Sequence, residues 1–160
     1  MSMGATKTDE TVEAIADLAL QARLSVAVAE SLTSGILSSE LGKGPDAAEW
    51  LKGGVVAYTP QVKQAVLDVT PGPVVTGRCA EEMAEGVARL FGADAAVATT
   101  GVGGPDPAEG KEPGTVFLGW WHDGRSGSRE HHFDGDPAHV LRLTVDAGLD
   151  MLLAVLNDTA

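Results

Sequence analysis

Three short runs rich in small apolar residues each lead into side chains that could do chemistry. Such runs are typical of strands buried inside a sheet, and the carboxyl ends of neighbouring parallel strands meet at one edge of that sheet. A hydroxyl, an amine and a phenol would then share one crevice. The runs are Ser25–Ala29, Gly53–Tyr58 and Asp94–Thr100, and the polar residues that end or follow them are Glu30, Ser31 and Thr33, then Tyr58, Thr59 and Lys63, then Thr99, Thr100 and Gly101.

The serine and the lysine of this crevice fit acyl transfer. A serine hydroxyl needs a base, and a lysine amine can be that base only if its pKa is lowered toward neutrality. Thr59 followed by Pro60 indicates a helix start, so Lys63 would feel the positive end of a helix dipole, which favours the neutral amine. Backbone N–H groups of the helix after Ser31 could hold an oxyanion or a phosphate, and the sequence does not decide between the two.

Each of these features also has a purely structural interpretation. A serine before a helix most often only caps it, and a lysine on an amphipathic helix is usually a solvated surface group. The Gly- and Pro-rich segment 101–114 could be a functional loop or a flexible connection. Trp120 and Trp121 could serve the core on one face and a partner on the other. An interaction domain is therefore an alternative to an enzyme.

Composition and missing motifs exclude several function classes. The net charge of −12 offers no basic surface to a nucleic acid or an anionic membrane, so neither is an expected partner. The longest uncharged run, Ala95 to Pro105, is far shorter than the ~20 residues of a membrane span. P-loop, dinucleotide and G-x-S-x-G motifs are absent, and His131 and His132 would point to opposite faces of a strand, so no metal site and no cofactor are expected.

The order of the expected elements predicts an α/β protein of one domain. With 160 residues and a single cysteine, Cys79, the chain suits a one-domain cytoplasmic protein. Helices alternate with strands, and the runs Thr115–Trp121 and Arg129–Phe133 bracket a loop over 122–128 as a hairpin. We predict a layered α/β/α fold with a mixed, mostly parallel sheet and an antiparallel hairpin in the C-terminal half. Residues 1–8 would form a disordered lead before a domain over 9–158.

Read together, the polar clusters resemble those of a known family. The chain is similar to the CinA C-terminal domain family, whose members include nicotinamide-nucleotide amidohydrolases, over roughly Val12 to Leu156. The segments that carry the resemblance are AESLTSG at 29–35, VVAYTPQVK at 55–63, TTGVGGPDP at 99–107, PGTV at 113–116 and FDGD at 133–136.

The resemblance implies an activity and a set of site residues. It implies a metal-independent serine amidohydrolase that converts nicotinamide mononucleotide to nicotinic acid mononucleotide and ammonia, and a homo-oligomer. It places the nucleophile on Ser31, the base on Lys63 and an assisting hydroxyl on Tyr58. The residues expected to bind the small-molecule nucleotide are Glu30, Thr33, Ser34, Gly35, Thr100, Gly101, Gly103, Gly104 and Arg142.

The chain also departs from the family pattern near the expected site. Leu32 stands where the family commonly has cysteine, and Ser34 stands at a usual glycine. Pro137 and Leu141 occupy the positions of two usual arginines, and Arg142 is displaced by one residue, which is about 100° around a helix. A catalytically silent nucleotide-binding or regulatory module of the same fold is therefore the alternative to an enzyme.

Overall fold

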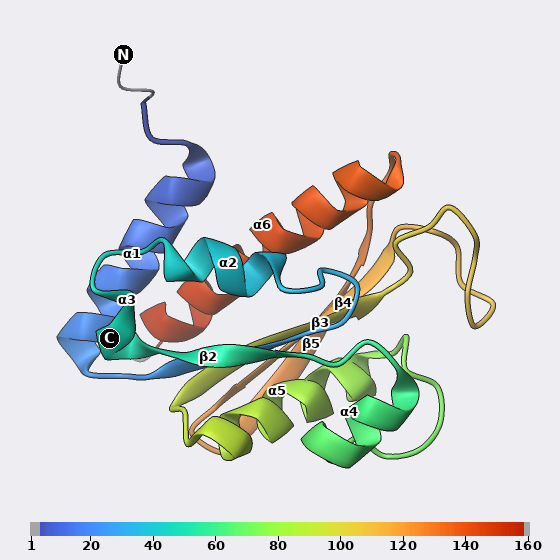
Figure 1. Cartoon of the computed structure of the whole chain (residues 1–160), viewed down its shortest axis with the longest axis horizontal. Helices are drawn as coiled ribbons and strands as arrows, with labels where there is room; N and C mark the ends of the chain where they lie inside the picture. Colours follow the sequence, from blue (N-terminus) through green and yellow to red (C-terminus); the bar gives the residue numbers. More distant parts are fainter. Residues whose placement is uncertain (1–3, 159–160) are drawn as a thin grey trace.

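A computed structural model describes residues 4–158, which form a five-stranded sheet between two layers of helices (Figure 1). The helices are α1 (Lys7–Ala22), α2 (Ile36–Gly42), α3 (Ala47–Trp50), α4 (Pro60–Leu67), α5 (Gly77–Phe91) and α6 (Pro137–Asn157). The strands are β1 (Val26–Glu30), β2 (Leu51–Val56), β3 (Ala95–Gly101), β4 (Thr115–His122) and β5 (Arg125–His132).

The sheet is mixed, and its strand order is β2-β1-β3-β4-β5. Strand β1 lies parallel to both β2 and β3, whereas β4 runs antiparallel to β3 and to β5. Every strand except β4 therefore points the same way, and the carboxyl ends of β1, β2 and β3 share one edge. This arrangement confirms the predicted mixed, mostly parallel sheet with an antiparallel hairpin in the C-terminal half.

Alternate side chains of the central strands build two separate cores. Val26, Val28 and Val97 pack with α1, α2 and α6 on one face of the sheet. Ala29 and Ala98 belong to the core on the other face, which α4 and α5 cover. Figure 1 shows α1, α2 and α6 on one side of the sheet and α4 and α5 on the other. The predicted α/β/α layering is confirmed, and its cause is the two-residue period of a strand.

Side-chain caps begin α4, α5 and α6, and the cap at Thr59 confirms the predicted helix start. Thr59, Thr76 and Asp136 each accept a hydrogen bond from the backbone N–H three residues later, and a proline follows Thr59 and Asp136. Helix α1 begins at Lys7, inside the expected lead over residues 1–8, because Thr6 and Asp9 form a reciprocal capping box. Residues 1–3 of that lead lie outside the described residues.

The hairpin of β4 and β5 corrects one sequence prediction. Asp123 and Gly124 have φ angles of 52° and 75°, which suit the two central positions of a type I′ turn. The turn therefore takes two residues, and the predicted loop over 122–128 is wrong. Arg125 pairs with His122 instead and opens β5. As a result, residues 125–128 are part of strand β5.

Two further boundaries differ from the sequence prediction. Strand β2 begins at Leu51, earlier than the predicted Gly53, because the backbone becomes extended directly after the single turn of α3. It ends at Val56, so Tyr58 lies beyond the strand.

Trp120 and Trp121 are both half-buried, and they pack against opposite cores. The sheet therefore uses both tryptophan side chains in packing.

Helix α6 is amphipathic and lies across the sheet. Val145, Leu149 and Leu152 are buried in the core with α1, whereas Asp150 and Ala154 are exposed. Within residues 4–158, no helix has both the length and the apolar character that crossing a membrane requires.

Gly86 lets α5 touch the end of α4, the helix that carries Lys63. A Cβ at residue 86 would collide with the backbone carbonyl of Leu67. We therefore expect Gly86→Ala to lower the free energy of unfolding by about 1–3 kcal/mol, the usual cost of overpacking, in urea unfolding. Gly42→Ala is the matched control, because no atom lies within 4 Å of its Cβ position. Equal stabilities of the two variants would contradict this view of the α4–α5 contact.

Candidate active site

The structure brings Ser31 and Lys63 into direct contact. Lys63 Nζ donates a hydrogen bond to Ser31 Oγ at 2.8 Å. Only 7% of Ser31 and 1% of Lys63 is exposed, so the pair lies almost entirely out of water. A lysine buried to this extent is rare unless its polar group has partners, and here a serine hydroxyl is one of them.

Two sheet-end segments position this pair. Ser31 directly follows β1, and its N–H donates to the carbonyl oxygen of Thr99 at the end of β3 (3.1 Å). Lys63 lies on α4, whose N-cap is Thr59, and its Nζ also donates to the carbonyl oxygen of Tyr58 (3.0 Å). The shared edge of β1, β2 and β3 therefore brings a hydroxyl from one turn to an amine from the next helix.

Burial also lowers the pKa of the amine. Loss of water around the ammonium lowers the pKa of Lys63 below its ordinary value of 10.5, against the opposing influence of Cys79 and Glu109. Burial raises the pKa of the Cys79 thiol to about 11, so this thiol is neutral near pH 7. A lysine whose pKa is lowered can accept a proton from a bonded hydroxyl more readily than a surface lysine can.

Glu30 does not face the dyad, although the sequence prediction included it among the substrate-binding residues. Its side chain is fully buried and accepts hydrogen bonds from the backbone N–H groups of Leu37 (2.8 Å) and Ser38 (2.9 Å). Hydroxyls of Thr33 and Ser38 donate to the same carboxylate at 2.6 Å each. Glu30 thus stabilises the start of α2, where a negative charge is favourable, and occupies amides that were expected to hold an anion.

The turn after Ser31 offers other backbone donors. Thr33 is buried, and its hydroxyl forms hydrogen bonds with Glu30 and Thr99. Ser34 is exposed and adopts a φ angle of 51°. Gly35 follows with φ 101°, a conformation that favours glycine. Among residues 4–158, the N–H groups of Leu32, Thr33 and Gly35 meet no hydrogen-bond acceptor. The free amides of this turn, rather than those of α2, are therefore the candidate oxyanion donors, with Leu32 and Thr33 next to Ser31.

The Gly- and Pro-rich loop after β3 is anchored by a residue that the sequence analysis missed. The Glu109 carboxylate accepts hydrogen bonds from the N–H groups of Val74 (3.0 Å) and Val75 (2.9 Å). Thr100 donates its hydroxyl to the carbonyl oxygen of Val74 (2.9 Å). No local sequence pattern marks Glu109, because its partners lie on a distant segment. The loop is tied down next to the start of α5.

Three loop glycines that were predicted to bind substrate have different surroundings. A Cβ at Gly101 would come within 2.6 Å of the Thr115 carbonyl oxygen, so this glycine permits close pairing with β4. Gly104 has φ 87°, and a Cβ there would lie 3.1 Å from Pro113. At Gly103 no atom lies within 4 Å of the Cβ position. Among these three glycines, Gly103 is therefore the one where a ligand could approach the backbone.

Two further predicted site residues lie apart from the dyad contact. The backbone carbonyl of Tyr58 bonds Lys63, but the tyrosine side chain is 65% exposed. Arg142 is exposed on α6, in the opposite helical layer from α4, and it forms no hydrogen bond or ion pair with any residue of the described part of the chain. The structure does not bring Arg142 into contact with Ser31 or Lys63.

The histidines serve other contacts. His131 stacks on Phe133 with ring centroids 5.0 Å apart, and His132 Nε2 lies 2.9 Å from a Glu130 carboxylate oxygen. Across residues 4–158, no group of three or more histidine, cysteine, aspartate or glutamate side chains is arranged to hold a metal ion.

The sequence and the fold are those of a known family. The sequence matches the CinA C-terminal domain over residues 8–156. The chain belongs to this family. A solved CinA superfamily structure from Klebsiella pneumoniae 700603 superposes with a TM-score of 0.91 at 30% identity, covering 96% of this chain and 99% of that one. One from Escherichia coli gives 0.90 at 31% identity, covering 97% and 94%.

Similar curated proteins are longer than this chain. A Bacillus subtilis protein named "Putative competence-damage inducible protein" is 38% identical over 139 residues, which cover 84% of this chain and 33% of that protein. A protein of the same name from Desulforamulus reducens is 38% identical over 149 residues, covering 89% and 36%. The chain thus spans about a third of the length of the curated relatives that it matches.

Two departures from the family pattern turn out to be neighbours. Leu32, directly after Ser31, is buried with Leu118 and Val140, and Leu141 packs against the same cluster. The positions at which the resemblance led us to expect cysteine and arginine therefore share one apolar cluster. An arginine at residue 141 would border this cluster, whereas leucine extends it. The two substitutions are consistent with each other as a packing arrangement.

Because Glu30 holds the turn of Ser31, its charge should matter for stability. We expect Glu30→Gln to lower the free energy of unfolding by about 1–3 kcal/mol, since an amide nitrogen would face donors that now bond a carboxylate oxygen. Urea unfolding followed by circular dichroism measures this. Glu13→Gln is the matched control, because Glu13 is exposed on α1 and its carboxylate forms no hydrogen bond or ion pair with another residue of the range 4–158. A Glu30 variant as stable as the control would show that the buried carboxylate does not support the turn.

Proposed function

We propose that the chain is a serine amidohydrolase in which Ser31 is the nucleophile and Lys63 the general base. The observation that carries this proposal is the buried 2.8 Å contact between Lys63 Nζ and Ser31 Oγ. A structural lysine has little reason to lie out of water beside a serine, whereas a catalytic amine needs both the burial and the contact.

The first half of the reaction forms an acyl-enzyme. With Lys63 neutral, the Ser31 hydroxyl donates its hydrogen bond to the amine lone pair, and Nζ takes the proton as Oγ attacks the carboxamide carbon. The N–H groups of Leu32 and Thr33 are the candidates to stabilise the developing oxyanion. Lys63 then returns the proton to the leaving nitrogen as the C–N bond breaks, so ammonia leaves and an ester remains on Ser31.

The second half restores the enzyme. A water molecule loses a proton to Lys63 and attacks the ester carbon, and the breaking C–O bond releases the carboxylic acid. Lys63 then protonates Ser31 Oγ. Throughout, the carbonyl oxygen of Tyr58 keeps Nζ in place at 3.0 Å. Tyr58 itself remains a proposed assisting hydroxyl, whose exposed side chain could approach a bound substrate.

The proposed substrate is nicotinamide mononucleotide, which would yield nicotinic acid mononucleotide. Membership of the CinA family supports this choice, and the accessible backbone at Gly103 is suited to approach by a substrate phosphate. Ser34 and Gly35, in the turn after Ser31, complete the proposed substrate surface together with Gly103. The proposal further includes that the reaction needs no bound cofactor, that the protein is a homo-oligomer and that it lies in the cytoplasm.

A second candidate function rests on the surroundings of Arg142. Arg142 has no contact with the dyad, and Leu141 lies in an apolar cluster beside Leu32. A chain without an arginine clamp for the phosphate could bind a nucleotide weakly, or take a different amide. The alternative is thus a catalytically silent nucleotide-binding or regulatory module, which would gain thermal stability with ligand but turn nothing over.

Ammonia release from nicotinamide mononucleotide tests the amidohydrolase. We expect the parent protein to release ammonia and Ser31→Ala to lose about 10³-fold or more of kcat, because the nucleophile is gone. Ser39→Ala, an exposed serine on α2, should keep the parent rate. Nicotinamide riboside, which lacks the phosphate, reports how much phosphate recognition contributes.

The results separate the two candidates. Ammonia release by Ser31→Ala at the parent rate would rule out Ser31 as the nucleophile. A folded parent that releases none, yet is stabilised against heat by the mononucleotide, would favour the silent binding module.

A further inference from the structure

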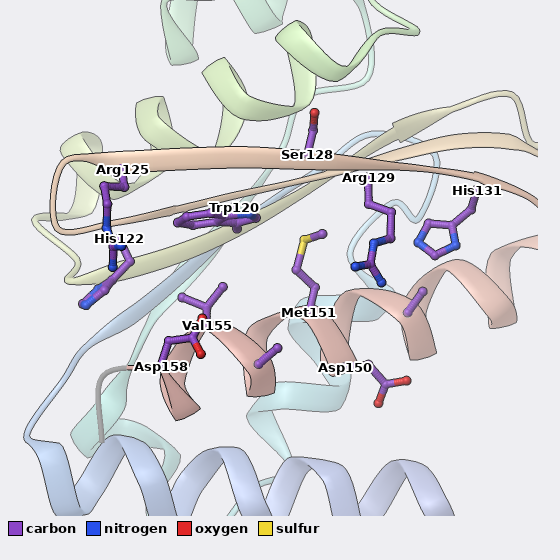
Figure 2. A pocket seen from close by; sticks show the side chains of 12 residues that line it. Trp120, His122, Arg125, Ser128, Arg129, His131, Asp150, Met151, Val155 and Asp158 are labelled. Atoms are coloured by element: carbon purple, nitrogen blue, oxygen red, sulfur yellow. The ribbon is translucent and has the colours of Figure 1, made fainter.

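A second site lies on the opposite face of the sheet from Lys63. A cleft of about 460 Å³ lies between strand β5 and helix α6 (Figure 2). This volume falls within the range of small-molecule sites. Helix α4, which carries Lys63, covers the other face of the sheet, so the cleft is separate from the dyad.

The sheet wall of this cleft carries two unpaired cations. Arg125 and Arg129 lie four residues apart on β5, so their side chains leave the same face of the sheet. Neither arginine forms a hydrogen bond or an ion pair with another residue in the range 4–158. Burial lowers the pKa of the neighbouring His131, so the positive charge here comes from the arginines. Two free guanidinium groups on a chain of net charge −12 favour an oxyanion ligand.

Apolar side chains lie between the two charged ends. Figure 2 shows Trp120, Met151 and Val155 between Arg125 at one end of the cleft and Arg129 at the other. The half-buried indole of Trp120 and the flexible thioether of Met151 give a planar ring an apolar surface to pack on. The cleft therefore combines anion binding with ring binding.

The α6 wall restricts where the anionic group can lie. Asp158 lies on this wall, and its carboxylate repels a ligand anion, whereas the Asp150 carboxylate is turned away from β5. The anionic group must therefore lie on the β5 side, while a hydroxyl of a ligand could donate to Asp158.

We propose that this cleft binds a small molecule with a planar ring and an anionic group, the ring against Trp120 and Met151 and the anion on Arg129 or Arg125. The shared chemistry is a phosphate or a carboxylate on an aromatic ring. This site is independent of the proposed amidohydrolase, because it uses none of the residues of the dyad.

Calorimetric titration of the full chain tests the proposal with two probes, adenosine 5′-monophosphate for a phosphate and indole-3-carboxylate for a carboxylate. We expect at least one probe to bind, and its ring without the anion, adenosine or indole, to bind at least about tenfold more weakly. Substituting both arginines, Arg125→Gln and Arg129→Gln, should lower the affinity for the probe by a similar factor. Both residues are exposed, so the fold should persist, and circular dichroism checks this.

Arg89→Gln is the matched control, because it removes one exposed arginine on α5, at the other face of the sheet. It should leave the affinity of the probe unchanged. Absence of binding by both probes would overturn the proposal. So would binding that the double arginine substitution does not weaken, which would place the probe elsewhere, for example beside Ser31.

Discussion

The burial of one lysine amine is the constraint on which the candidate site depends. Taking an ammonium out of water costs several kcal/mol, so Lys63 can stay 1% exposed only where polar partners replace the water or where its pKa falls. Both conditions are met: Ser31 Oγ and the carbonyl oxygen of Tyr58 accept hydrogen bonds from Nζ, and burial lowers the pKa. The stability of the buried amine and the proposed catalytic role of Lys63 thus depend on the same contact.

The rest of the fold brings the two partners of this contact together from opposite layers. Helix α4 carries Lys63 and packs on one face of the sheet, where Gly86 of α5 allows close approach to Leu67. The turn of Ser31 is held from the other face, because Glu30 points toward α2 and bonds its first amides. Successive residues at the end of β1 therefore have different tasks: Glu30 fixes the turn, and Ser31 meets the lysine.

The sequence predicted the parts of this arrangement that depend on local signals. The capping residue Thr59 marked a helix start, and the polar residues after the apolar runs marked the sheet edge where Ser31 and Lys63 meet. The direction of the Glu30 side chain was missed, because it depends on which helical layer covers that face of the sheet. Glu109 was missed because its partners, Val74 and Val75, are distant in sequence. The start of β5 could have been found, since Asp123-Gly124 is a known hairpin signal.

A titration of the lysine amines tests the central claim most directly. In protein labelled with ¹³C at the lysine side chains, NMR follows the carbon next to each amine as the pH rises, and Lys63→Arg identifies the signal of Lys63. The account predicts a titration midpoint for Lys63 below 10.5, the ordinary pKa of a lysine amine, because burial disfavours its ammonium form. A Lys63 signal that titrates at or above this ordinary value would contradict a buried amine ready to serve as a base.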